Sequence, residues 1–307
     1  MSQDKASSKI SLGIAITLFA YLFFSVASSL VWTFQGKFPT IQIIFLQNAI
    51  AFFTILPLSL RKGWNYLKTN ELHIHLIRDL FGLTSYFLFF LAIRFLNLVD
   101  ATILNYASPF FVPFVWWLWM KEKIDPHIWW VIIFGFIGVA LILSPGSEIF
   151  DLGFIFGIFA AITAAIALVS IRILNVRKEP MRRTLFYFFS ISSLLSFPFA
   201  WASWTAPSPT EWGLCFLIGL ATAIGQVLLT IAYRHGTASY LSPLGYSVVL
   251  YNMLISYYFF EAPLNQKSLL GATLIIVSGT ATYVFKRKPK TVKQTFQVPN
   301  PKDKPPM

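Results

Sequence analysis

The sequence predicts an all-α polytopic membrane protein, with ten transmembrane helices arranged as two inverted five-helix repeats. Composition is the first observation behind this. The 307 residues are 56% hydrophobic and only 12% charged, with a mean hydropathy of +0.67. Soluble domains carry roughly twice that charge. The second observation is that apolar stretches long enough to cross a hydrocarbon core of about 30 Å recur along the chain. The third is that a helix pair in the first half is written again in the second.

Each expected helix is an apolar run bounded by turn-forming or charged residues. Asp125 precedes Pro126 as an N-cap acid before a Pro at the first helical position, where the missing N–H is not needed. Residues 144–146, Ser-Pro-Gly, end the fifth helix. The expected helices cover 12–32, 40–60, 76–95, 101–120, 126–143, 152–174, 184–203, 211–234, 240–260 and 268–285.

Several classes of protein are excluded by composition. The net charge of +12 is interpreted as loop charge that anchors topology, so no nucleic acid is expected as a partner. Cys215 is the only cysteine, so neither a disulfide nor a cysteine-based metal site is expected. The first apolar run, 10–34, is too long for a cleavable signal peptide.

Lys and Arg positions predict the orientation in the membrane. With the N-terminus in the cytoplasm, 21 of the 24 Lys and Arg residues lie on the cytoplasmic side. Only Lys37, Arg94 and Lys267 fall outside, in agreement with the positive-inside rule. Ten helices then place both termini in the cytoplasm. The basic, Pro-rich residues 287–307 are expected to be a disordered cytoplasmic tail.

The repeated helix pair covers residues 89–124 and 228–264. In each copy one apolar helix ends in Ala-x-Arg, and the next carries a Pro near its start and a Glu just after its end. Five helices per half force the halves to have opposite orientations, so the repeats are assigned as 1–148 and 149–286. Inverted repeats are typical of secondary transporters, whose substrate site lies near the midplane between the halves. The matching residues are Ala92, Arg94, Pro109 and Glu122, and Ala232, Arg234, Pro243 and Glu261.

Ionisable residues are expected only at helix ends and in loops, Asp79 included. A coupled proton pump is therefore disfavoured, because such proteins usually carry an ionisable group inside the membrane. His73 and His75 are two residues apart and do not share a helical face, so no metal or cofactor is expected there.

Neutral polar residues do reach the middle of the expected helices. Interhelical hydrogen bonding alone explains many of them. The amides are costlier to bury, and their clustering favours an uncharged, aromatic-rich cavity between the halves. Candidate substrate-binding residues are Ser28, Trp32, Asn48, Tyr86, Asn105, Tyr106, Gln226, Tyr246, Tyr251 and Asn252.

Two blocks resemble the drug/metabolite transporter superfamily, specifically its EamA-type ten-helix branch. They are DATILNYASPFFVPFVWWLWMKEKI in the first half and SPLGYSVVLYNMLISYYFFEAPL in the second. The resemblance covers about residues 12–285 and implies a carrier that works by alternating access. Phe260 departs from the pattern, because many members have Gly before the second-half acid.

The resemblance implies a multi-pass protein of the bacterial inner membrane that moves a small organic metabolite. Amino acids, nucleoside-like solutes and S-adenosylmethionine stay open as substrates, since Tyr and Trp faces can hold a sulfonium cation. A homodimer also stays open. No enzyme activity is expected. The alternative is a non-transporting membrane protein, either a lipid-modifying enzyme, which needs a catalytic cluster, or a scaffold.

Overall fold

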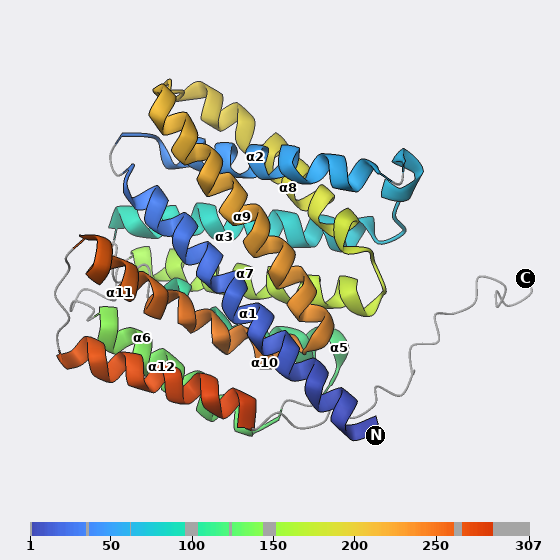
Figure 1. The fold of residues 1–307 in the computed structure, drawn as a ribbon, viewed down its shortest axis with the longest axis vertical. Helices are drawn as coiled ribbons and strands as arrows, with labels where there is room; N and C mark the ends of the chain where they lie inside the picture. The colour runs from blue at the N-terminus through green and yellow to red at the C-terminus, as the bar shows by residue number, and fades with distance from the viewer. Residues whose placement is uncertain are drawn as a thin grey trace, which may run out of the picture.

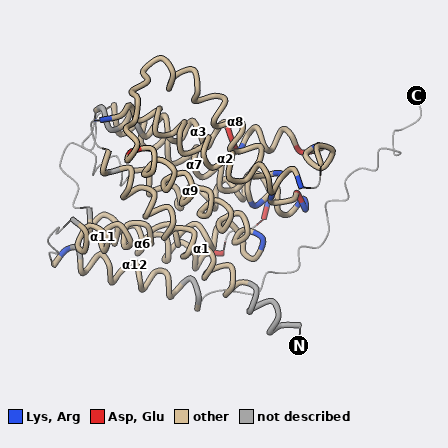
Figure 2. Tube along the Cα trace, turned by 45° about the horizontal axis from the view of Figure 1, so that its top comes forward, with Lys and Arg blue, Asp and Glu red and all other residues tan. Residues whose placement is uncertain are grey.

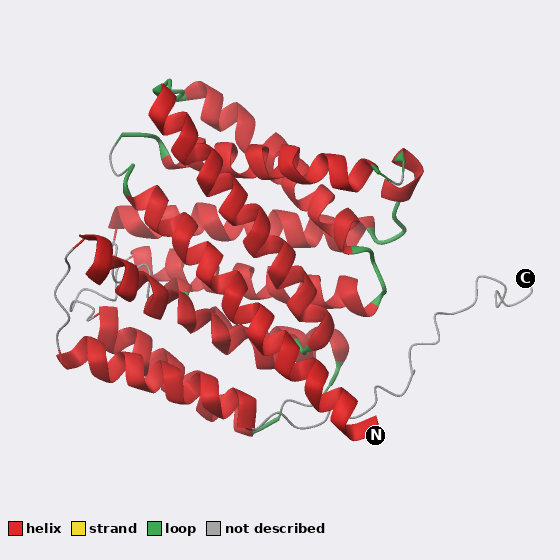
Figure 3. Cartoon of the chain, viewed as in Figure 1, coloured by secondary structure: helices red, strands yellow, loops and turns green. Residues whose placement is uncertain are grey.

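All regular elements in the described part of the chain are helical (Figure 3). The computed structural model describes residues 2–34, 37–61, 63–95, 104–122, 125–143, 152–260 and 266–284. The long helices are α1 (Ser2–Trp32), α2 (Thr40–Leu60), α3 (Leu72–Phe95), α5 (Ser108–Met120), α6 (His127–Leu143), α7 (Leu152–Val176), α8 (Met181–Ala202), α9 (Pro209–His235), α11 (Ser247–Phe260) and α12 (Gln266–Val284). Short helices are η1 (Trp64–Leu67), α10 (Ala238–Leu241) and η2 (Ser242–Tyr246).

Five of these helices, α1, α2, α7, α8 and α9, are long and apolar enough to cross a membrane. Shorter apolar stretches occur in α5, α6 and α12. The expectation of an all-helical chain is confirmed for the described residues. The expected tail 287–307, together with Glu261, lies outside them.

Four helices differ from the sequence expectation by a turn or more. α1 begins at Ser2 rather than residue 12, and α5 begins at Ser108 rather than residue 101, with Pro109 in its first turn, where the missing N–H is not needed. α3 begins at Leu72, a full turn early, where the Thr69 hydroxyl accepts the Glu71 N–H at 2.9 Å just before the helix. The expected helix 240–260 is broken into α10, the 3₁₀-helix η2 and α11. Pro243 at the start of η2 has no N–H for a helical hydrogen bond, which explains the break.

The helices pack in a pattern that has an approximate two-fold symmetry. α3 packs on α7 as α9 packs on α1, and α5 contacts α7 as α11 contacts α1. α2 packs on α8 and α6 packs on α12, so these two pairs map onto themselves when the halves are exchanged. The long helices lie side by side across the molecule (Figure 1). The packing is that of two repeats with equivalent positions.

The α6–α12 contact shows this symmetry at the level of single residues. A Cβ built on Gly138 would lie 2.6 Å from the Gly271 carbonyl oxygen and 2.9 Å from Ile275 Cγ1. A Cβ built on Gly271 would meet the Gly138 carbonyl oxygen and Ile142 in return. Small residues let apolar helices approach closely. The two glycines therefore set the spacing of this helix pair.

Most charged residues lie toward the two ends of the helices, with few between them (Figure 2). The segments between α2 and α3 and between α7 and α8 lie at one end, which we call the Arg177 end (Figure 1). The segments between α1 and α2 and between α8 and α9 lie at the opposite end, which we call the Lys37 end. α1 starts at the Arg177 end.

Candidate functional site

Ion pairs connect the two repeats at both ends of the helix bundle. At the Lys37 end, Lys37 pairs with Glu211 in the first turn of α9. At the Arg177 end, Arg177 Nη1 lies 2.5 Å from Glu71 Oε2, just before α3. Each pair joins one residue from either half.

The two ion pairs occupy equivalent positions in the repeats. The offset of 140 residues that separates Ala92 from Ala232 also separates Lys37 from Arg177, and Glu71 from Glu211. The basic residue of each half therefore contacts the acidic residue of the other. Neither pair was identified from the sequence, although the shared offset is a signal that could have found both.

Side chain to backbone bonds reinforce each end. At the Lys37 end, Gln42 Nε2 donates to the Thr205 carbonyl at 2.6 Å, and the Thr205 N–H donates back to Gln42 Oε1 at 2.9 Å. At the Arg177 end, Arg183 Nε and Nη2 donate to the Tyr66 carbonyl at 2.8 and 2.6 Å. Both ends are closed by polar contacts between the halves.

The Arg177 end carries an additional network around Glu179, which is 7% exposed. The Thr69 hydroxyl donates to Glu179 at 2.5 Å, His75 Nε2 lies 3.0 Å from Oε1, and Arg183 donates to both carboxylate oxygens at 3.1 Å. Burial alone raises the pKa of Glu179. The hydrogen bonds from Thr69, His75 and Arg183 outweigh it and hold the pKa below its usual value.

This network predicts that part of the free energy of unfolding is lost at acidic pH. Because the folded pKa of Glu179 is lower than the unfolded pKa, its contribution is complete above the unfolded value and is lost as the pH falls through the folded value. Glu179→Gln is expected to lower the unfolding free energy near neutral pH by about 1–3 kcal/mol. It should also make the unfolding free energy depend less on pH in the acidic range. Chemical denaturation of purified protein across acidic pH measures this. If the unfolding free energies of wild type and Glu179→Gln fell equally with acidic pH, the prediction would be contradicted.

A second polar cluster lies in the interior, between α3 and α9. Arg78 is 2% exposed and Asp79 is fully buried, two turns inside α3. Arg78 Nη1 donates to Asp79 Oδ1 at 3.0 Å, and Nη2 donates to Gln226 Oε1 on α9 at 3.2 Å. The guanidinium also lies 3.9 Å from the centre of the Phe188 ring on α8. This cluster connects three helices from both repeats.

The position of this cluster corrects the sequence expectation. Asp79 was expected at a helix end, and no ionised side chain was expected inside the bundle. Both expectations are wrong, because α3 starts a turn early and carries Arg78 and Asp79 into the buried interior. Two adjacent opposite charges between apolar residues are the sequence signal that marks such a pair.

Tyr86 has its exposed surface on the interior side of α3. On a helix with 3.6 residues per turn, Tyr86 shares a face with His75 and Asp79, which are fully buried. Leu80 and Phe87, 48% and 58% exposed, lie on another face. Tyr86 is nevertheless 41% exposed and lies close enough to Arg78 for electrostatic interaction. Its open surface therefore faces the bundle interior.

A third polar cluster joins α1 and α11. The Ser25 and Ser28 hydroxyls both donate to Asn252 Oδ1, the second at 3.2 Å. Ser25 is fully buried, whereas Ser28 is exposed. The structure thus brings together two predicted residues, Ser28 and Asn252, and adds Ser25.

The other predicted residues have different surroundings. Asn48 donates to the Ile44 carbonyl of its own helix at 2.7 Å, and Tyr246 is fully buried against α6. Asn105, Tyr106 and Tyr251 are half-buried, and Tyr106 lies within electrostatic range of Tyr86. The side chain of Trp32 lies outside the described part of the structure.

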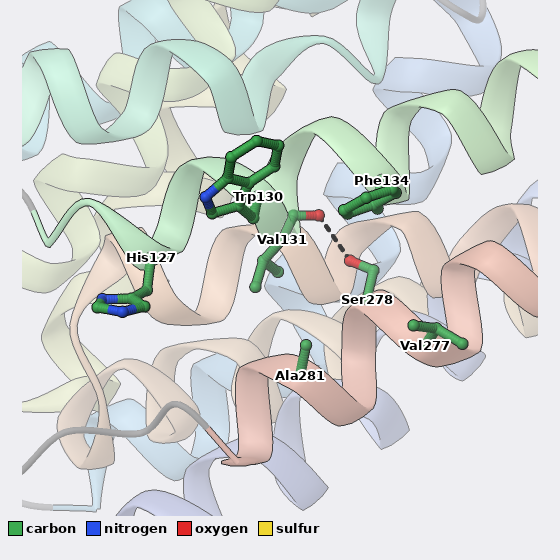
Figure 4. Close-up of a pocket in the computed structure, with 7 residues that line it drawn as sticks. All are labelled: His127, Trp130, Val131, Phe134, Val277, Ser278 and Ala281. Carbon is green, nitrogen blue, oxygen red and sulfur yellow. Dashed lines mark hydrogen bonds between the residues drawn. The ribbon is translucent and has the colours of Figure 1, made fainter.

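Two pockets described in the structure both border α12. The larger, of about 420 Å³, lies between α6 and α12, where the Ser278 hydroxyl donates to the Val131 carbonyl at 2.7 Å (Figure 4). The smaller is lined by Gln266, Leu269, Leu270 and Thr273. Neither contains a predicted substrate-binding residue. The larger is lined by His127, Trp130, Val131, Phe134, Val277, Ser278 and Ala281.

Comparison with known proteins identifies the class. The EamA-like transporter family matches residues 11–144 and 151–283, once for each half. The chain belongs to this family, which confirms the resemblance inferred from its sequence. The family and the named relatives are transporters, so the chain is a membrane transporter and not an enzyme.

Relatives with named solutes cover most of the chain. The chain is 29% identical over 268 residues to the pseudopaline exporter CntI of Pseudomonas aeruginosa (strain UCBPP-PA14), covering 87% of this chain and 94% of that protein. It is 27% identical over 259 residues to the S-adenosylmethionine uptake transporter of Rickettsia bellii, covering 82% and 86%. It is 27% identical over 273 residues to the riboflavin transporter of Brucella anthropi, covering 87% and 95%.

A solved crystal structure shares the fold. It superposes with a TM-score of 0.75, at 18% sequence identity, and covers 91% of this chain and 97% of that chain.

Proposed function

We propose that the chain is a ten-span secondary transporter that moves a small organic metabolite across the bacterial inner membrane by alternating access. Both termini then lie in the cytoplasm, and the Arg177 end of the bundle is the cytoplasmic end. The two repeats are taken as 1–148 and 149–286. Relatives named for pseudopaline, S-adenosylmethionine and riboflavin support an organic solute.

One observation carries the alternating-access proposal. Alternating access requires the halves to separate at one end while they stay in contact at the other. The Lys37–Glu211 and Arg177–Glu71 pairs supply equivalent contacts between the halves at opposite ends. Symmetry of this kind lets the same rearrangement open either end.

The interior polar clusters are the proposed solute contacts. Gln226 on α9 and Asn252 on α11 lie on helices that pack on α1, and Tyr86 exposes its ring on the interior side of α3. Asn48 is left out, because its amide bonds its own helix.

Transport by purified protein in proteoliposomes tests the proposal. The assay is exchange of radiolabelled solute at equal pH on both sides, with a panel of S-adenosylmethionine, riboflavin and the amino acids. We expect Asn252→Leu to lower the initial rate about tenfold, because loss of one polar contact to the solute removes about 1 kcal/mol or slightly more.

Asn48→Leu is the matched control for Asn252→Leu. It removes the same amide from a position bonded only within its own helix, so we expect it to leave the rate within about twofold of wild type. The proposal fails if no solute in a wide panel is exchanged. Equal losses in both variants would reject the assignment of Asn252.

A further inference from the structure

The buried pair Arg78 and Asp79 has bonding capacity that the fold leaves unused. Within the described residues, Arg78 Nε and Asp79 Oδ2 are buried without a hydrogen-bond partner. Leaving a buried donor or acceptor unpaired is costly, and the cost is larger for charged groups. An ionised pair inside a membrane protein is a functional candidate by default. Both atoms therefore require an explanation.

Charge balance gives that explanation. Arg78 and Asp79 together are neutral. Protonation of Asp79 would leave the Arg78 guanidinium as a buried charge without a counter-ion, which is strongly unfavourable. An arriving anion would restore neutrality by taking the donors that Asp79 gives up. A proton and an anion are thus each poorly tolerated alone and favourable together.

Resting on the proposed function, we propose that Asp79 and Arg78 couple the binding of one proton to the binding of one carboxylate group of the transported solute. Asp79 takes the proton and Arg78 takes the carboxylate. Arg is suited to this role because its planar guanidinium binds carboxylates through paired donors.

Few other charged groups are placed to replace this pair. Gln226, the α9 partner of Arg78, is neutral. On α7, Arg172 donates to the Tyr233 carbonyl at 2.6 Å. The other titratable or charged side chains described on α3 and α8 are His73, His75, Tyr86, Arg182, Arg183 and Tyr187, and Glu179 lies between α7 and α8.

Most of these groups have contacts elsewhere: His73 lies 3.8 Å from Glu71, and Arg182 donates to the Leu58 carbonyl at 3.3 Å. His75 and Arg183 are bonded to Glu179, and Tyr187 stacks on His75. Arg78 is buried in this structure, so the solute would reach it when α3 and α9 separate.

The first test needs no solute. Infrared spectra of the full-length protein in liposomes are recorded across a pH titration, for wild type and Asp79→Asn. We expect wild type to show a protonated-carboxyl band that titrates and that Asp79→Asn lacks. Identical titrations in the two proteins would overturn the assignment of the proton to Asp79.

The second test measures binding with matched acid and non-acid probes. Thermal shift is followed with S-adenosylmethionine against its decarboxylated analogue, and with each amino acid against its amide. By reciprocal linkage, wild-type affinity for the carboxylate form should rise about tenfold per pH unit lowered while free Asp79 is ionised. Asp79→Asn should make that affinity independent of pH, and Arg78→Gln should abolish the preference for the acid.

A purely structural role for the pair gives a different result. Asp79→Asn would then lower the melting temperature and leave the pH slope unchanged, which would overturn the proposal. Equal affinity for acid and non-acid forms, or binding of riboflavin alone, would also overturn it. If exchange at equal pH fails for every solute, the transport proposal fails, and the infrared result still decides whether Asp79 binds a proton.

Discussion

Lys37→Glu is expected to make Cys215 about fivefold more reactive toward a membrane-impermeant maleimide. Cys215 is the only cysteine, is 4% exposed, and lies one helical turn after Glu211 on α9. The substitution replaces the Lys37–Glu211 attraction with repulsion and opens the Lys37 end. The substitution removes an attraction and adds a repulsion of similar size, so its effect is about twice that of losing the pair, which gives a change of about fivefold. Labelling rates in proteoliposomes measure it.

Arg177→Glu should act in the opposite direction. It weakens the contact with Glu71, opens the Arg177 end and so closes the Lys37 end, which lowers Cys215 labelling below wild type. Lys68→Glu is the control, since Lys68 is exposed and has no ion pair within the described residues. If Lys37→Glu and Arg177→Glu both raised labelling, the two ends would open independently and alternating access would be contradicted.

Gly138→Leu is expected to destabilise the fold by about 3 kcal/mol or more, because overpacking against fixed atoms is poorly tolerated. Even a Cβ at Gly138 would lie 2.6 Å from the Gly271 carbonyl oxygen and 3.1 Å from the Ile275 backbone nitrogen. Backbone atoms cannot rotate away, so α6 and α12 must separate. Gly138→Ala should cost about 1–3 kcal/mol. Thermal unfolding in detergent measures both.

Gly213→Ala is the matched control for Gly138→Ala at the α6–α12 contact. Nothing lies within 4 Å of a Cβ at Gly213, and the residue is helical, so the change should be neutral or stabilising by less than about 1 kcal/mol. Equal melting temperatures for Gly138→Ala and wild type would show that α6 and α12 separate at little cost, and would reject the close contact.

Helix boundaries could be predicted where proline or charged residues flank an apolar run. α2 spans Thr40–Leu60 as expected, because Pro39 precedes it and basic residues follow it. The prediction failed at the starts of α1, α3 and α5 and at the break before α11. The early start of α3 depends on a hydroxyl contact from Thr69. The break depends on whether Pro243 is tolerated in an α-helix or shifts it to 3₁₀ geometry.

The site was less predictable, because a polar stripe on a helix does not show where each side chain bonds. Asn48 and Asn252 look alike in sequence, yet the first bonds its own turn and the second bonds α1. Tyr246 was expected to contact substrate, but it packs where a Cβ on Gly135 would clash with its ring. Helix-to-helix distances decide these cases, and one sequence does not contain them.

The two ends of the bundle are equivalent in position but unequal in strength. Each end has an equivalent ion pair between the halves and bonds to a loop carbonyl. Within the described residues, the Arg177 end adds the contacts of Thr69, His75 and Arg183 to Glu179. A resting transporter without a driving gradient should therefore spend more time open at the Lys37 end. Acidification at the Arg177 end alone would reduce that bias. The preference for one open state would therefore depend on the pH on one side of the membrane only.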